Sequence, residues 1–312
     1  MKIFYYQRAD GLTNFGDLLN IWLWNRLLPD VFDEDETITF VGIGTLLNNL
    51  LPQRIPQAKK LIIFSTGAGY EKNLNSIPAN WHIACVRGVL SAKKLGLPPD
   101  LVVTDGAILV RRLFQPTAKK TSSFAFMPHI HHAKFAGTAW QKICTQIGFQ
   151  YIDPRWNIEK VLANLSGTEV IITEAMHGAI VADALRGPWI PVVTSARILQ
   201  FKWLDWCSSM GLEYRPHYLM PLRELYPPVA QGIRSSARAI QHWGNCWQQL
   251  PYLAQIWRDR QQLCAAQLVH IAQTAHPYLS QEKQLEQLTI ELEDRLHAIG
   301  LIVNTGVFGS NV

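Results

Sequence analysis

Apolar residues fall into two alternating kinds of segment along this chain. Short, mostly apolar runs predict buried strands, and longer segments with apolar residues at helical spacing predict helices. Strands are expected over residues 2–7, 37–43, 60–65, 82–86, 101–104, 124–127, 149–152, 170–173 and 189–193. Helices are expected over residues 17–28, 88–95, 138–147, 157–165, 179–185 and 200–210, the second ended by Gly96 and the last by Gly211. The alternation predicts an α/β fold, with parallel sheets covered by helices.

Two changes in the pattern of apolar and polar residues divide the chain. Residues 114–122 are polar and poor in apolar side chains, so we place a boundary there between α/β domains over 1–115 and 122–230. From about Ser235 the pattern becomes that of amphipathic helices, expected over 237–250, 252–273 and 281–299. We expect this helical tail, residues 231–312, to pack on the two domains or bridge them; a role at a membrane surface or in an oligomer is the alternative. Ligands of parallel sheets bind beyond the carboxyl ends of the strands, so the cleft between the domains is the expected site.

Composition narrows the class of protein. With 312 residues, 48% hydrophobic and 17% charged, the chain is a folded globular protein of about two domains. Its net charge of +5 comes from scattered basic residues, which argues against nucleic acid and suits anionic small molecules or a membrane surface. Five dispersed cysteines without a CxxC pair indicate reduced thiols. No signal peptide or transmembrane segment is recognisable, so we expect a cytoplasmic protein.

The most informative segment is the junction of a strand and a helix at 173–179, which reads Thr-Glu-Ala-Met-His-Gly-Ala. We expect Thr173 to cap the helix and His177 to lie about one turn into it. A helix start presents unpaired N–H groups and positive potential, so it suits an anionic ligand. The segment therefore predicts an anion site that contains a titratable imidazole. The alternative is an ordinary junction with a hydrogen-bonded histidine.

Further polar residues follow other predicted strands and could face the same cleft. Asn14, Gly16 and Asp17 open the first helix, where the alternative is a capped turn. Candidate cations for a carboxylate or phosphate are Arg87, Arg197 and Lys202, with a surface ion pair or a solvated side chain as the alternative. His129, His131 and His132 lack a nearby acid or cysteine, so we expect no metal, and His129 is the one nearest the cleft. The Gly42–Gly44 and Gly67–Gly69 pairs do not extend to a dinucleotide-binding fingerprint.

Together these segments resemble the polysaccharide pyruvyl transferase family, in particular the subgroup that acts on exopolysaccharides such as succinoglycan. The resemblance rests on the order of short motifs over about residues 1–215: Asn14-Phe15-Gly16-Asp17, Val86-Arg87-Gly88 with Ser91 and Leu95, Thr104-Asp105, Met176-His177, Phe201-Lys202 with Trp206, and Gly211-Leu212. It implies two Rossmann-like domains arranged as in GT-B glycosyltransferases, with the acceptor on the N-terminal side and the donor on the C-terminal side. It also implies transfer of pyruvate from phosphoenolpyruvate to two hydroxyls of one sugar as a ketal, without a cofactor.

The resemblance suggests roles for individual residues. The acceptor is commonly a lipid-linked glycan at the cytoplasmic face of the membrane, so peripheral membrane contact is expected. His177 suits the acid that protonates the donor, and Asp17 or Glu174 suits a base, with Glu174 orienting His177 or facing the sugar. Asn14, Gly16, Arg87, His129, Thr173, Arg197 and Lys202 are the expected substrate-binding residues. The chain departs from the family pattern at Ala175, where an arginine is usual, so Arg87, Arg197 or Lys202 must replace it or the donor differs.

Two other functions fit the same architecture. A GT-B-type glycosyltransferase would bind a nucleotide sugar and needs an acidic residue for the ribose hydroxyls, a role open to Glu174. A scaffold of polysaccharide assembly without catalytic activity is suggested only by the missing arginine at Ala175.

Overall fold

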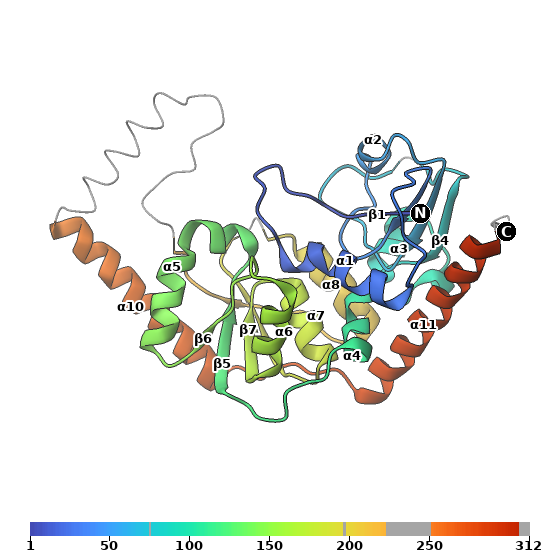
Figure 1. The fold of residues 1–312 in the computed structure, drawn as a ribbon. Coiled ribbons are helices and arrows are strands. Elements are labelled where there is room, and N and C mark those ends of the chain that lie inside the picture. The colour runs from blue at the N-terminus through green and yellow to red at the C-terminus, as the bar shows by residue number, and fades with distance from the viewer. Residues whose placement is uncertain (75, 196–197, 223–250, 306–312) are drawn as a thin grey trace, which may run out of the picture.

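Two parallel sheets organise the computed structural model, which describes residues 1–74, 76–195, 198–222 and 251–305 (Figure 1). The first sheet has the order β1 (Lys2–Phe4), β2 (Ile38–Val41), β3 (Lys60–Phe64), β4 (Trp81–Cys85). The second has the order β6 (Gln150–Tyr151), β5 (Ser122–Met127), β7 (Thr168–Thr173), β8 (Trp189–Val193), β9 (His217–Tyr218). The α/β class predicted from the sequence is confirmed.

Helices connect the strands of both sheets. The first half contains α1 (Phe15–Leu27), α2 (Leu51–Arg54), α3 (Val89–Leu95) and α4 (Val110–Leu113), and the second contains α5 (Ile130–Gln146), α6 (Ile158–Ser166), α7 (Met176–Ala184) and α8 (Gln200–Met210). Gly96 and Gly211 end α3 and α8 in the left-handed conformation, with φ of 66° and 64°, as the sequence predicts. The helix predicted over 237–250 and residue Arg197 lie outside the described residues.

Three details of the predicted elements are wrong. Residues 101–104 do not form a strand: a 3-10 turn over Pro99–Leu101 is followed by a single bridge between Val86 and Val102. Helix α5 begins at Ile130 rather than Thr138. The sequence pattern misses its first part because a non-helical residue, Ala136, interrupts the apolar periodicity inside the helix. The short edge strand β9 carries too little pattern to be recognised from sequence.

The two halves share a continuous apolar core. One cluster of buried side chains joins Trp24 and Phe64 of the first half to Ile171 and Trp203 of the second. Helix α1 crosses between them: it packs on α6 and α7, and its first residue, Phe15, donates a backbone hydrogen bond to Pro154 O. The carboxyl ends of both sets of strands are therefore held at a fixed separation by packing.

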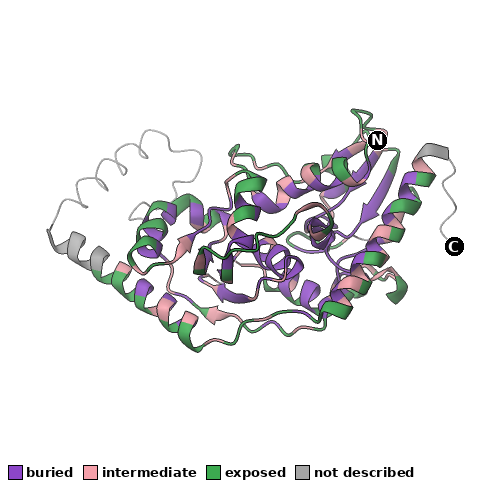
Figure 2. Cartoon of the chain, turned by 60° about the horizontal axis from the view of Figure 1, so that its bottom comes forward, coloured by how far each residue is buried: buried purple, intermediate pink, exposed green. Residues whose placement is uncertain are grey.

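The C-terminal helices cover the outside of this core. Helix α10 (Pro251–Thr274) packs against α5, and α11 (Glu282–Thr305) contacts β4 of the first half. Over residues 259–274 and 282–303, where burial is described, both helices mix buried and exposed residues (Figure 2). No helix in the described part of the chain is both long and apolar enough to span a bilayer.

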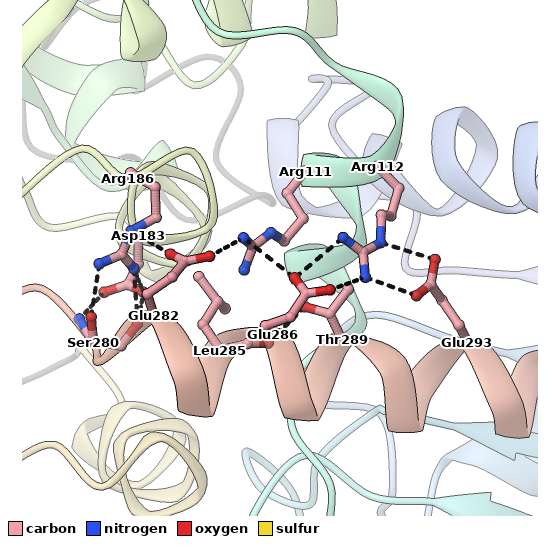
Figure 3. A network of polar contacts seen from close by, with 10 residues as sticks. All are labelled: Arg111, Arg112, Asp183, Arg186, Ser280, Glu282, Leu285, Glu286, Thr289 and Glu293. Carbon is pink, nitrogen blue, oxygen red and sulfur yellow. Dashed lines mark hydrogen bonds and ion pairs between the residues drawn. The ribbon is translucent and has the colours of Figure 1, made fainter.

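Ion pairs tie α11 to the body of the protein (Figure 3). Arg111 and Arg112 of α4 meet a row of carboxylates on α11, namely Glu282, Glu286 and Glu293. Glu282 also pairs with Arg186, which follows α7 in the second half, at 2.8 Å. At the far end of α11, Arg295 donates to the backbone oxygens of Ala84 and Asp100. Helix α11 therefore links the two halves through these contacts.

Candidate active site

A cavity of about 480 Å³ lies at the carboxyl ends of the strands of both sheets. The order of the second sheet reverses at β5, which has β6 on one side and β7 on the other. Such a switch point opens a crevice between the loops that follow the two neighbouring strands. The loops after β5 and β7 carry His129 and His177, and both line the cavity. Asn14, Asp17 and Lys202, also expected from the sequence, line it too.

His177 is the second residue of α7, so it lies closer to the start of the helix than we expect from the sequence. The cap at Thr173 is wrong: the N-cap residue is Ala175, and the Thr173 hydroxyl accepts a hydrogen bond from the Ala175 N–H at 3.0 Å. That hydroxyl also lies 3.2 Å from Met127 O. Thr173 is therefore buried in the turn that places His177, and it does not line the cavity.

Asp105 lies behind the imidazole of His177. Its Oδ2 is 3.6 Å from Nε2, and neither atom has a hydrogen-bond partner. The other carboxylate oxygen accepts the N–H of Ala107, which fixes the side chain. Asp105 is fully buried and His177 is only 15% exposed, so the pair meets in a site with little water. Asp105 is therefore the acidic neighbour of the imidazole. Its sequence signal, Asp105-Gly106, resembles an ordinary turn.

Gly16 touches the opposite edge of the imidazole. A Cβ atom placed on Gly16 would lie 2.1 Å from Nδ1 of His177, well inside contact distance. The absence of a side chain therefore lets α1 approach α7 closely. Gly16 contributes to the site by leaving room for the imidazole, and the ring is held between the first turn of α1 and Asp105.

We expect Gly16→Ala to lower turnover by about 10²-fold, because the imidazole must leave its place and small displacements of a reacting group have effects of this order. The measurement is the initial rate of phosphate release from phosphoenolpyruvate with a glycan acceptor. Gly300→Ala is a control for expression and handling: this glycine lies within α11, away from the cavity, and a Cβ on it would meet only the end of the Leu28 side chain, at 3.3 Å. Equal rates for Gly16→Ala and the parent would show that the close approach has no catalytic purpose.

Asp17 lines the cavity from the first half, as the carboxylates Asp10 and Glu71 also do. Asn14 donates to its Oδ2 at 2.8 Å instead of capping α1 through its side chain. Burial raises the pKa of Asp17, an effect opposed by the Asn14 hydrogen bond and by the charges of His177 and Lys202. A raised pKa makes Asp17 a stronger proton acceptor than a solvated carboxylate.

Lys202 brings a buried positive charge to the cavity. It belongs to α8, its side chain is 8% exposed, and Nζ donates to the Tyr70 hydroxyl at 3.0 Å. Among the described residues no carboxylate lies within salt-bridge distance of it. Burying a charge without a counter-ion is costly, so an unpaired ammonium group in a cavity favours an anionic ligand.

Arg87 has a different place from the one expected. Its guanidinium group is fully buried: Nε donates to Asp205 of α8 at 2.9 Å and Nη1 donates to Gly44 O and to the Thr45 hydroxyl. It does not line the cavity, although Gly44 and Thr45 do. In this structure the contacts of Arg87 hold α8 and the loop after β2 together, and its guanidinium group is not at the cavity where a donor contact was expected.

Glu174 also turns away from His177 and from the cavity. Its Oε1 accepts the N–H of Thr194 at 2.8 Å and the Thr194 hydroxyl, and its Oε2 accepts the N–H of His129. Burial alone would raise the pKa of this carboxyl, but His132 and the Thr194 hydroxyl outweigh burial and hold it well below its usual value. The expected roles of orienting His177 or facing the sugar are thus corrected: Glu174 is a buried anchor for the loop after β5.

The three histidines of that loop have separate environments. Burial lowers the pKa of His129 well below its usual value, with a further effect from Lys202, so this ring is neutral in the cavity. His131 is exposed, and His132 lies with Nε2 3.0 Å from Leu222 O. Within the described residues no cluster of three or more histidine, cysteine or acidic side chains has the geometry to hold a metal ion.

Comparison with known proteins agrees with this geometry. The sequence profile of the polysaccharide pyruvyl transferase family matches residues 14–195, a range that includes α1, the loops after β5 and β7, and every motif between them. The chain belongs to this family and is a transferase. It is 38% identical over 251 residues, covering 80% of this chain and 74% of the relative, to the succinoglycan biosynthesis protein ExoV of Rhizobium meliloti (strain 1021).

Proposed function

We propose that this protein transfers pyruvate from phosphoenolpyruvate to a sugar of an exopolysaccharide precursor, as a ketal. The observation that carries the proposal is the unpaired Lys202 ammonium in the same cavity as His177. Phosphoenolpyruvate carries about three negative charges near neutral pH, which suits a buried cation at the start of a helix. Lys202 is also our candidate to replace the family arginine that is missing at Ala175, because it brings a cation to the same cavity as His177.

The residues of the cavity can move the protons that the reaction requires. In the first step one sugar hydroxyl adds to C2 of the donor, its proton passes to Asp17, and the imidazolium of His177 protonates C3 to form the methyl group. In the second step the other hydroxyl adds to C2 as the bond from C2 to the phosphate oxygen breaks, and its proton returns to His177. Asp17 gives its proton to the departing phosphate or to solvent, so both residues end as they began.

The positions of Asp105 and Asp17 fit these roles. Asp105 keeps a carboxylate beside the ring that is proposed to act as the acid, since its Oδ2 lies 3.6 Å from Nε2. Asp17 has a pKa raised by burial, which suits the base of the first addition. The donor itself carries the electrophilic carbon and the leaving group, so the proposed reaction needs no cofactor.

The glycosyltransferase alternative loses the residue that supported it. Glu174, the candidate for the ribose hydroxyls, is fully buried with both oxygens engaged, so that role would fall to Asp10, Asp17 or Glu71, which line the cavity. Membership in a transferase family likewise leaves no observation that favours a scaffold without activity. We place the reaction in the cytoplasm, with a lipid-linked oligosaccharide presented at the inner face of the membrane as the acceptor.

The test of this proposal is a direct assay. Purified protein is incubated with phosphoenolpyruvate and a lipid-linked oligosaccharide, and inorganic phosphate and the mass of the glycan are followed. We expect phosphate and a ketal-bearing glycan in equal amounts. Thermal-shift measurements with uridine and guanosine sugar nucleotides serve as the comparison, and stabilisation by one of these but not by phosphoenolpyruvate would contradict the proposal.

We expect Lys202→Met to weaken phosphoenolpyruvate binding by about 10–150-fold, corresponding to the loss of one charge-assisted contact of about 1.5–3 kcal/mol. Methionine keeps the length and apolar character of the side chain, so α8 should stay packed. The dissociation constant is measured by calorimetric titration. Lys134→Met is the matched control: this lysine also lines the cavity but is exposed and paired with Asp10 at 2.8 Å. A larger effect at Lys134 than at Lys202 would contradict the assignment.

A further inference from the structure

Two tyrosine rings stand at the wall of the cavity that the first half provides, and the proposed chemistry does not use them. Tyr70 follows β3 and is 57% exposed, and Tyr6 follows β1 and is 41% exposed. Both line the same cavity as Lys202 and His177.

Tyr70 is held in a strained backbone conformation. Its φ of 64° lies in the left-handed region, which a bulky residue rarely adopts because its Cβ crowds the backbone. Strain of this kind persists where the surrounding structure imposes it and is concentrated at ligand-binding positions. The preceding Gly69 has φ of 142°, and a Cβ on it would lie 2.9 Å from Thr45 and 3.1 Å from Leu199, so the chain passes close to both residues just before Tyr70.

The hydroxyl of Tyr70 fixes the position of its ring relative to the donor site. It accepts a hydrogen bond from Lys202 Nζ at 3.0 Å, and the ammonium nitrogen is 5.6 Å from the centre of the ring. The face of the Tyr70 ring therefore lies next to the proposed anion site at Lys202. A group stacked on this ring would lie beside a donor held by Lys202, as a two-point attack on C2 requires.

The chemistry of the wall around the rings suits a sugar. The guanidinium group of Arg54 lies 5.5 Å from the centre of the Tyr6 ring. Other residues that line the cavity have amide or carboxylate side chains, namely Asp10, Asn48 and Glu71. Pyranose rings present one face of C–H groups and a rim of hydroxyls. Aromatic rings bind the C–H face, and amides and carboxylates bind the hydroxyls.

We propose that Tyr70 and Tyr6, which line the same cavity, form the acceptor subsite and that Tyr70 stacks against the apolar face of a hexopyranose. This inference rests on the proposed function for the identity of the reaction, but the binding of a sugar to the two rings can be measured without phosphoenolpyruvate. The ligand class is a hexose that exposes a continuous C–H face and keeps two hydroxyls free toward Lys202 and His177.

The test uses saturation-transfer difference NMR with methyl β-glucopyranoside and methyl β-galactopyranoside as probes. We expect transfer to the ring C–H protons of at least one of them with the parent protein, and a reduction of about tenfold or more in affinity for Tyr70→Ala. Tyr70→Phe keeps the ring and loses the hydroxyl, so sugar binding should stay within about twofold while phosphoenolpyruvate binding weakens. Equal sugar binding by Tyr70→Ala and the parent would overturn the proposal.

A further variant separates binding from folding. Tyr70→Gly removes the left-handed strain, so we expect its melting temperature to be at or above that of the parent while sugar binding is lost. A lower melting temperature, with sugar binding retained, would show that Tyr70 serves structure alone. If the parent protein does not bind phosphoenolpyruvate, the proposed function is refuted. If the parent protein does not bind either glycoside, only the acceptor subsite is refuted.

Discussion

Replacement of His177 by glutamine should lower turnover by about 10²–10⁴-fold, the range that a positioned general acid contributes. His177 lies between Asp105 and Gly16 with its ring at the cavity, and in the proposed mechanism its removal leaves C3 of the donor without a proton source. Glutamine approximates the size of the imidazole and should keep α7 in place. The measurement is the rate of phosphate release under saturating donor and acceptor.

Binding and folding distinguish this effect from damage to the protein. We expect the melting temperature of His177→Gln to stay close to that of the parent and donor binding to change by less than tenfold. His270→Gln is the matched control, since His270 is exposed on α10, away from the residues that line the cavity. Turnover of His177→Gln within a few fold of the parent would remove His177 from the chemistry.

Loss of the buried ion pair between Arg87 and Asp205 should have the largest effect on stability. Asp205 lies on α8, and its carboxylate accepts the Arg87 Nε, the Ser91 N–H and the Ser91 hydroxyl. Both charges are fully buried, so Asp205→Asn leaves a guanidinium group without its counter-ion. Removal of one partner from such a pair costs about 3–5 kcal/mol of the free energy of unfolding, measured by urea denaturation.

A double variant tests whether the cost comes from the uncompensated charge. Arg87→Met with Asp205→Leu removes both charges, and we expect it to be more stable than Asp205→Asn alone. Glu213→Gln is the control for an exposed pair, because Glu213 and Arg215 are both largely solvent-accessible, and it should leave unfolding unchanged. If Asp205→Asn unfolds at the same urea concentration as the parent, the pair does not hold the two halves together.

This ion pair explains a motif that the sequence presents as a ligand-binding site. The spacing of Arg87, Gly88 and Ser91 makes room for Asp205: a Cβ on Gly88 would lie 1.9 Å from the Asp205 backbone oxygen. An arginine at the end of a strand looks the same in sequence whether it binds a substrate or a distant helix. The decisive partner lies more than a hundred residues away, and only the fold brings it close.

The architecture was largely predictable because it depends on local patterns. Strand β8 and helix α8 have the expected bounds, and Gly96 and Gly211 end their helices as expected. The residues that line the cavity were predictable where a residue follows a buried strand or opens a helix, as His177 and Asp17 do. Asp105 and Tyr70 were not, because their importance comes from long-range contacts with His177 and Lys202.

Glu174 shows the same limit from the other direction. It lies three positions before His177, a spacing that in a continuous helix places two side chains on one face. The helix begins only at Met176, so Glu174 belongs to the extended turn and its carboxylate points to Thr194 and His129. A shift of the helix start by a few residues changes a candidate base into a buried anchor.

The most direct test of the central claim is the reaction in deuterated water with phosphoenolpyruvate and an oligosaccharide acceptor, followed by proton NMR of the product glycan. The account predicts a pyruvate ketal whose methyl group carries one deuterium, delivered to C3 through the imidazole of His177, together with an equal amount of inorganic phosphate. A glycan without the ketal methyl signal, or extended by a sugar from a nucleotide donor instead, would contradict it.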